Sequence, residues 1–160
     1  MIRVGITGHS SLTPRTREMV RAALRTTLRP HVQHGLHGVT CLARGADQLF
    51  AHAVRDVGGS YEVVLPADDY RDAKVKPDDL PEFDTLVEYA TTVHIMPFST
   101  SGRAAYQAAS AHILDTVDWL VAVWDGQPSD GAGGTGDTVA AARERGLPVT
   151  VVWPEGAARD

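Results

Sequence analysis

The sequence lacks residues and segments that several classes of protein need. It has one cysteine, Cys41, among 160 residues, which excludes an intramolecular disulfide and a cysteine-based zinc site. It has no run of roughly 18 apolar residues, so we expect no membrane-spanning helix and no membrane partner. No signal peptide precedes the strand-like residues at the start, and we therefore expect a soluble, cytoplasmic protein.

Positive charge is also scarce. The 15 lysines and arginines are outnumbered by 20 aspartates and glutamates, which gives a formal net charge of -5. This balance argues against a general nucleic-acid-binding protein and makes single-stranded DNA an unlikely partner. The charge is uneven, because residues 1–40 hold six arginines and one acid, so a local basic face stays compatible with the sequence. The 43% of apolar residues are enough for one globular domain over residues 1–160.

Apolar segments of two periodicities alternate along the chain. Short runs predict strands, and runs with helical spacing predict helices that follow them. We expect strands at 2–6, 39–42, 61–65, 92–96, 119–124 and 148–153, helices at 14–28, 45–57, 81–90, 103–116 and 138–146, and a loop at 67–81. Such alternation is typical of an α/β fold, here a Rossmann-like three-layer sandwich with a mostly parallel sheet.

Three polar loops should meet at one edge of this sheet. In open parallel sheets, ligands bind beyond the carboxyl ends of the strands, at the point where the strand order reverses. The loops after the first, second and fifth strands, at 7–11, 43–47 and 125–137, should converge there. They are also rich in glycine and hydroxyl side chains.

The first loop contains Thr7, Gly8, His9 and Ser10. Gly8 allows a ligand to approach the backbone closely, and the amides at the following helix start favour a phosphate. His9 can bind phosphate or act as a general acid. A tight turn with serine or threonine capping, and a histidine with a purely structural hydrogen bond, explain the same residues. This first loop contains neither the G-x-G-x-x-G nor the G-x-x-x-x-G-K pattern.

The second loop offers Arg44, Gly45 and Asp47. A guanidinium suits bidentate phosphate contacts, and an acid at this place can accept ribose hydroxyls. Alternatively, Arg44 and Asp47 only cap the helix.

The third loop is the richest in glycine. Asp125 and Gly126 begin it, and the candidate anion site at its end consists of Gly133, Gly134, Thr135, Gly136, Asp137 and Thr138. A glycine-rich loop at a helix N-terminus presents amide donors to an anion. The alternative is a surface linker, since such composition is common in linkers.

Other catalytic patterns are weak. His31, His34 and His37 are spaced by three residues, but Pro30 and Gly35 interrupt the helix that would align them, so we expect no metal site. No G-x-S-x-G elbow is present, and we expect no bound cofactor.

Four short motifs occur in a recognisable order. They are Thr7-Gly8-His9, the segment LARGAD at Leu42–Asp47, the apolar strand with WDG at Trp119–Gly126, and GGTG at Gly133–Gly136. This order resembles the SLOG superfamily, which joins the DNA-processing DprA branch with the Lonely Guy phosphoribohydrolases. The resemblance implies a Rossmann-like fold that binds a nucleotide or phosphoribosyl ligand, with phosphate on Gly133–Gly136. It also implies a homo-oligomer, most simply a dimer, and the alanine-rich segment 103–116 would allow close helix packing.

Two functional hypotheses follow. The first is a sensor or binding module for a nucleotide or phosphoribosyl compound. The second is a phosphoribohydrolase that releases the base from a nucleoside 5'-monophosphate, with Asp137 and Asp47 as the catalytic acids. Ala140 stands where the phosphoribohydrolase motif has its acidic residue, so the catalytic set of that branch is incomplete here.

Overall fold

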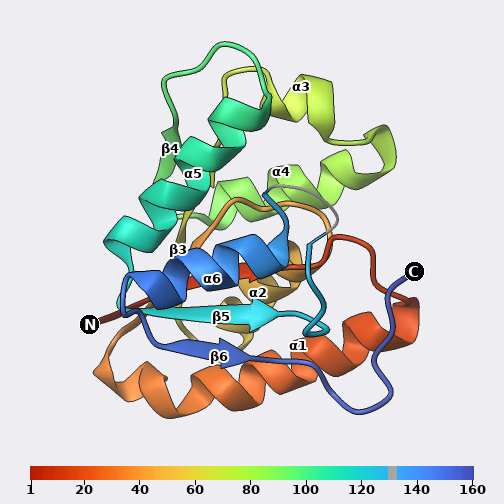
Figure 1. Ribbon diagram of the computed structural model, residues 1–160, viewed down its shortest axis with the longest axis vertical. Coiled ribbons are helices and arrows are strands. Elements are labelled where there is room, and N and C mark those ends of the chain that lie inside the picture. The colour runs from red at the N-terminus through yellow and green to blue at the C-terminus, as the bar shows by residue number, and fades with distance from the viewer. Residues whose placement is uncertain (130–132) are drawn as a thin grey trace.

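A six-stranded parallel sheet forms the centre of the computed structural model, which describes residues 1–129 and 133–160 (Figure 1). The strand order is β4-β3-β2-β1-β5-β6, and each of the five strand pairs is parallel. The strands are β1 (Ile2–Gly8), β2 (Leu36–Thr40), β3 (Ser60–Leu65), β4 (Val93–Ile95), β5 (Trp119–Val123) and β6 (Val149–Val151). The order reverses between β1 and β5, which confirms the Rossmann-like α/β fold.

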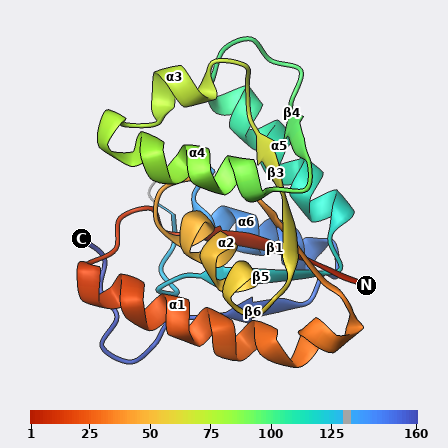
Figure 2. The same ribbon diagram turned by 180° about the vertical axis from the view of Figure 1, so that it is seen from behind.

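Helices cover both faces of the sheet. They are α1 (Pro14–Leu28), α2 (Ala46–Asp56), α3 (Tyr70–Lys74), α4 (Leu80–Tyr89), α5 (Arg103–Thr116) and α6 (Thr135–Glu144), with the 3-10 turns η1 (Arg29–His34) and η2 (Pro77–Asp79). Figure 1 shows α5 and α6 in front of the sheet, and Figure 2 shows α2 and α4 in front when the molecule is turned round. Within the described residues, no helix combines the length and apolar character needed to cross a membrane.

The first helix begins where its sequence predicts. The Thr13 hydroxyl accepts a hydrogen bond from the Thr16 amide, and Pro14 occupies the first helical position, where its missing N–H costs nothing. Val20, Leu24 and Leu28 then recur on one face and are fully buried. This face packs against α2 and fixes the path of the chain out of the first loop.

Several expected boundaries differ from the structure. The first strand runs to Gly8, so Thr7 and Gly8 of the expected first loop lie at its end. The second strand lies at 36–40 instead of 39–42. Gly38 belongs to this strand although it has no side chain, because the ring of Phe50 packs against its backbone. The expected loop at 67–81 contains α3 and η2, since burial of Tyr70 against Phe83 orders it. Helix α6 starts at Thr135, three residues early, and β6 ends at Val151.

Part of the small-residue surface of α5 is used within the chain. Ala105 and Ala109 are each 1% exposed and pack toward the sheet, where Gly5 also leaves room for Ile113. They are therefore not available to pair with another copy, and the homodimer stays a prediction.

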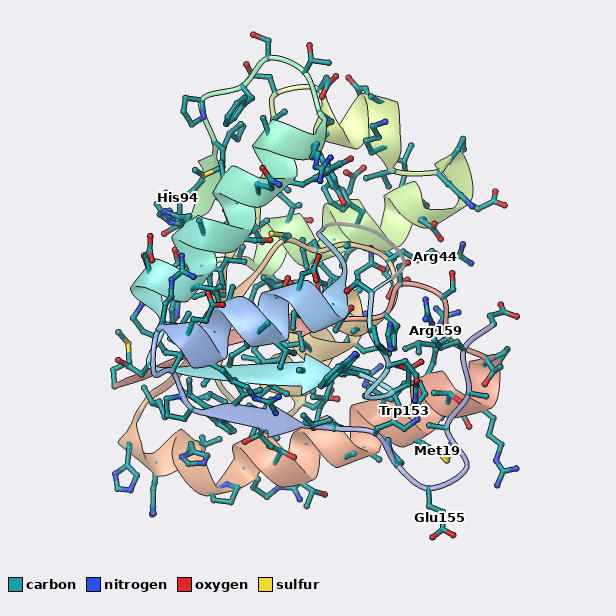
Figure 3. The ribbon with its side chains drawn as sticks, in the orientation of Figure 1. Met19, Arg44, His94, Trp153, Glu155 and Arg159 are labelled. Carbon is teal, nitrogen blue, oxygen red and sulfur yellow. The ribbon has the colours of Figure 1, made fainter. Side chains whose placement is uncertain are left out.

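A polar cluster around the buried Glu62 lies at the end of the sheet opposite to the three predicted loops. The Glu62 carboxylate accepts hydrogen bonds from Arg3 at 2.7 Å and lies 3.0 Å from Nε2 of both His37 and His94. His37 also contacts the Ser60 hydroxyl at 2.8 Å. Of the three histidines considered for a metal, His37 is thus engaged with Glu62 and lies on a strand. Figure 3 shows His94 far from Arg44 and Arg159, which mark the other end.

Substitution of Gly8 tests the tight packing at the end of β1. A Cβ at Gly8 would lie 2.4 Å from Cβ of Ala46 and 2.8 Å from Cβ of Val123, neither of which is a flexible chain end. We expect Gly8→Ala to lower the free energy of unfolding by about 3 kcal/mol, the upper end of overpacking costs, in urea titrations followed by circular dichroism. The control Gly102→Ala, where nothing lies within 4 Å, should stay within about 1 kcal/mol. Equal effects of the two variants would contradict this account.

Candidate ligand-binding site

A cavity of about 430 Å³, here called the central cavity, opens where the strand order reverses. The loops after β1, β2 and β5 all contribute to its wall, as the sequence predicts. Ten of the candidate residues line it: Thr7, Gly8, His9, Ser10, Asp47, Gly133, Gly134, Thr135, Gly136 and Thr138. The rest of the lining combines apolar side chains such as Ile6 and Ile113 with polar ones such as Ser110 and Gln127. A cavity of this size and mixed lining is typical of small-molecule sites.

His9 ties the three loops together. Its amide donates to the Val123 carbonyl at 3.1 Å, and its carbonyl accepts from the Ala46 amide at 3.1 Å. Its ring Nε2 accepts the Asp125 amide hydrogen at 3.0 Å, which puts the proton of the neutral ring on Nδ1. Burial, together with the nearby charge of Arg159, lowers the pKa of His9 despite the opposing effect of Asp125. The neutral ring is therefore a structural acceptor at neutral pH.

Two glycines allow the loops to touch. Gly45 has φ 85°, and a Cβ there would lie 2.6 Å from the carbonyl oxygens of His9 and Ser10. Together with Gly8, it brings the start of α2 directly against the first loop. No larger residue fits between them, so the depth of the cavity depends on both glycines.

The N-terminus of α6 presents amide donors on one side of the central cavity. Two donors are already used, because the Gly133 amide donates to the Asp137 carboxylate at 2.7 Å and the Asp137 amide to the Ser129 hydroxyl at 3.2 Å. Among the described residues, the amides of Gly134, Thr135 and Gly136 have no acceptor. Such donors, at the positive end of a helix dipole, favour an anion.

Asp47 is a buried acid that lines the same cavity. It is 9% exposed, and burial raises its pKa to about 7, although the Ala43 amide donates to its Oδ2 at 3.2 Å and opposes the shift. Its carboxyl group is therefore partly protonated at neutral pH. A protonated carboxyl can donate a hydrogen bond to a ligand, and an ionised one can accept from a sugar hydroxyl.

Some lining residues were not among the candidates. Arg159 reaches the central cavity from the C-terminal segment, where Leu12 and Arg159 form an isolated antiparallel bridge and Arg159 Nη1 lies 3.7 Å from Asp125 Oδ2. No local motif marks it. Tyr70 and Tyr106 line the cavity from α3 and α5, and Trp124 lies at its edge with Nε1 donating to the Gln127 carbonyl. Trp124 could have been predicted as a lining residue, because it directly precedes the third loop in the sequence.

Other candidates lie elsewhere. Asp137 lines an adjoining groove between α5 and α6, and Arg44 lines a smaller neighbouring cavity. The groove shares Tyr106, Ser110, Leu114, Gly133 and Thr138 with the central cavity. Gly45, Asp125 and Gly126 support the loops without lining the central cavity. Residues 130–132, which include Gly131 of the third loop, lie outside the described residues.

The fold is shared with three solved structures of low sequence identity. DNA processing protein A from Streptococcus pneumoniae superposes with a TM-score of 0.69 at 16% identity, covering 98% of this chain and 52% of that one. DNA processing protein A from Helicobacter pylori, described in a single-stranded DNA binding mode, gives 0.68 at 14% identity, with 99% and 68% covered. The molybdenum cofactor binding protein from Rippkaea orientalis gives 0.61 at 15%, with 96% and 77% covered.

The Rossmann-like fold that the SLOG resemblance implies is thus confirmed. DprA, one of the two branches that the motifs indicated, has the same architecture over nearly the whole chain. This chain spans about half the length of the Streptococcus pneumoniae protein. No protein-family model matches the sequence, and no curated protein matches it. At these identities the likeness concerns the fold, and the function must be argued from the site.

Replacement of Asp47 tests its burial. The pKa of about 7 in the folded state lies above the ordinary aspartate pKa of 3.8, so the folded state binds more protons between these pH values and loses stability as the pH rises through them. We expect Asp47→Asn, which keeps an oxygen for the Ala43 amide, to gain stability over the wild type by roughly 2–3 kcal/mol between pH 5 and pH 8 in urea titrations. The curve of the surface control Asp78→Asn should run parallel to that of the wild type. A constant difference for Asp47→Asn would refute the buried-acid assignment.

Proposed function

We propose that this protein binds a nucleotide or another phosphoribosyl compound in the central cavity and acts as a sensor or binding module. The observation that carries the proposal is that three loops converge on one cavity at the point where the strand order reverses. The amides of Gly134, Thr135 and Gly136, which have no acceptor among the described residues, provide for a phosphate group, and the apolar lining near Ile6 and Ile113 provides for a less polar part of the ligand.

The remaining groups suit the same ligand. Arg159 adds a cation to the rim, and Asp47 can exchange hydrogen bonds with sugar hydroxyls. Tyr70, Tyr106 and Trp124 supply aromatic surface against which a base can pack. The Rippkaea orientalis protein, which shares the fold, is by its name a binder of a small-molecule cofactor, and this supports a small ligand here.

Calorimetry with Gly134→Asp tests the proposal. A Cβ at position 134 would lie 2.6 Å from Oγ of Ser129, and the carboxylate would add negative charge at the N-terminus of α6. We therefore expect displacement of Ser129 and repulsion of the phosphate to weaken binding of a nucleotide by roughly tenfold or more. The panel contains nucleoside mono-, di- and triphosphates, cyclic nucleotides and ADP-ribose. The control Gln33→Asp adds the same charge on η1, before β2, and should leave affinity unchanged. Binding of no compound, or equal binding by Gly134→Asp, would overturn the proposal.

The ligand panel must also contain single-stranded DNA, because the Helicobacter pylori protein that shares this fold is described in a single-stranded DNA binding mode. The net charge of -5 and the small volume of the central cavity favour a mononucleotide-sized ligand over a polymer. Binding of a single-stranded oligonucleotide in a strongly salt-dependent manner, with no response to small nucleotides, would instead favour the DNA-binding role.

A second candidate function is hydrolysis of the N-glycosidic bond of a nucleoside 5'-monophosphate. The observation that favours it is Asp47, because an acid with a pKa of about 7 inside the cavity can transfer a proton at neutral pH. Asp137 is less suited, since its carboxylate accepts from the Gly133 amide and the residue lines the adjoining groove.

Chromatography of the products tests this activity. If the protein is a hydrolase, free base and ribose 5-phosphate should accumulate, and Asp47→Asn should slow turnover by roughly 100-fold or more, as expected for loss of a general acid. Asp137→Asn is the comparison, because it removes the second candidate acid but leaves the wall of the central cavity in place. Turnover that survives both substitutions would exclude the assignment of these acids.

A further inference from the structure

A smaller cavity borders the central cavity and holds both lysines of the chain. It has a volume of about 230 Å³, and Arg44, Lys74 and Lys76 line it together with the hydroxyl-bearing Ser10 and Ser11. We call it the lysine pocket. The sequence contains only two lysines in 160 residues, and both line this cavity.

Its charge is opposite to that of the whole chain. Three cationic side chains face one carboxylate, Asp79, while the net charge of the protein is -5. Arg44 and Asp79 form an ion pair with an Nε to Oδ2 distance of 3.9 Å, which is too long for a hydrogen bond, so the guanidinium keeps its donors for another acceptor. Within the described part of the chain, Lys74 and Lys76 form no ion pair. Their ammonium groups are therefore available to an anion.

The segment 42–47 is divided between the two cavities. Leu42 has φ 56°, which is rare for a residue with a branched side chain, and the buried Gln48 amide holds its carbonyl at 3.1 Å. This reversal, with the one at Gly45, sends Arg44 toward the lysine pocket and leaves Asp47 on the central cavity. Backbone strain of this kind persists only where its surroundings enforce it, and it is common at ligand sites.

The two cavities have a common wall. Ser10 and Tyr70 line both of them, so the spaces are separated by no more than side chains. Figure 3 shows Arg44 and Arg159 on the same side of the molecule, where β5 and β6 end. One small ligand can therefore occupy the central cavity and reach the lysine pocket.

We propose that the ligand of the central cavity carries a second phosphate, which Arg44, Lys74 and Lys76 hold in the lysine pocket. This inference rests on the proposed function and narrows the ligand class to nucleotides with two phosphate groups. The second phosphate is either on the 3' position of the ribose or on the 5' phosphate, since the chemistry of the pocket is the same for both.

The test compares ligands that differ only in the second phosphate. The probes are the 5'-monophosphates, 5'-diphosphates and 3',5'-bisphosphates of adenosine, guanosine, cytidine and uridine, titrated by calorimetry. We expect at least one doubly phosphorylated probe to bind roughly tenfold or more tightly than its monophosphate, as charge-assisted hydrogen bonds allow. Whether this probe is a bisphosphate or a diphosphate identifies the position of the second phosphate.

The variant Lys74→Gln/Lys76→Gln should abolish this advantage. Both side chains are exposed, so the fold should survive, and unchanged thermal unfolding checks this. Affinity for the monophosphate should stay within about twofold, because its phosphate uses the amides of α6. The control Arg29→Gln/Arg143→Gln removes two exposed cations that line neither cavity, and should keep the full advantage.

The outcomes separate this inference from the proposed function. Equal affinity for singly and doubly phosphorylated probes, or an advantage that survives in the lysine variant, overturns the second-phosphate site and leaves nucleotide binding intact. Binding of no nucleotide overturns the proposed function itself. Lysine-dependent binding of a single-stranded oligonucleotide, with no such effect for small probes, assigns the pocket to a polymer backbone and also overturns the inference.

Discussion

The backbone of His9 is the point on which the candidate site depends. Its amide and carbonyl bond to β5 and to the start of α2, and its ring accepts the amide at the start of the third loop. Three segments far apart in the sequence are therefore fixed by one residue. The two hydrogen bonds of the main chain require that Gly8 and Gly45 have no side chain, since a Cβ at either would displace the partners. The cavity exists because these contacts hold its walls at a set separation.

This arrangement lowers the stability of the folded protein in a way that a purely structural turn would not require. Asp47 is buried with a raised pKa, and Leu42 adopts a positive φ, so the second loop is locally unfavourable in two independent ways. Strain and buried titratable groups concentrate where a protein binds or reacts. The first loop, by contrast, shows neither feature: the His9 ring is neutral, and its Nε2 already accepts a hydrogen bond from the Asp125 amide. The chemistry of the cavity thus resides in the second and third loops, and the first serves to position them.

The sequence predicted which edge of the sheet the polar loops share, because one rule fixes it. Alternating strands and helices imply a parallel sheet, and a parallel sheet exposes the loops after its strands at one end, so Thr7, Asp47 and Gly134 could be grouped without a structure. The rule says nothing of side-chain direction. Asp137 and Arg44 were grouped with them by position, but the Asp137 carboxylate accepts from the Gly133 amide and Arg44 lines another cavity. Local hydrogen bonds of a helix start decide such directions.

Long-range packing decides what the sequence could not predict. Arg159 reaches the cavity because the C-terminal segment pairs with Leu12 and bonds to the start of α1, contacts across more than 140 positions that no local pattern records. Lys74 lies at the end of α3, a short helix ordered mainly by the burial of Tyr70, and Lys76 follows it at the start of η2. Net charge was equally uninformative about this region, because it sums over the whole chain, whereas an anion responds to groups within about 10 Å. A chain with a surplus of acids can therefore build a cationic pocket from very few residues, provided that the fold collects them beside donors that are already open.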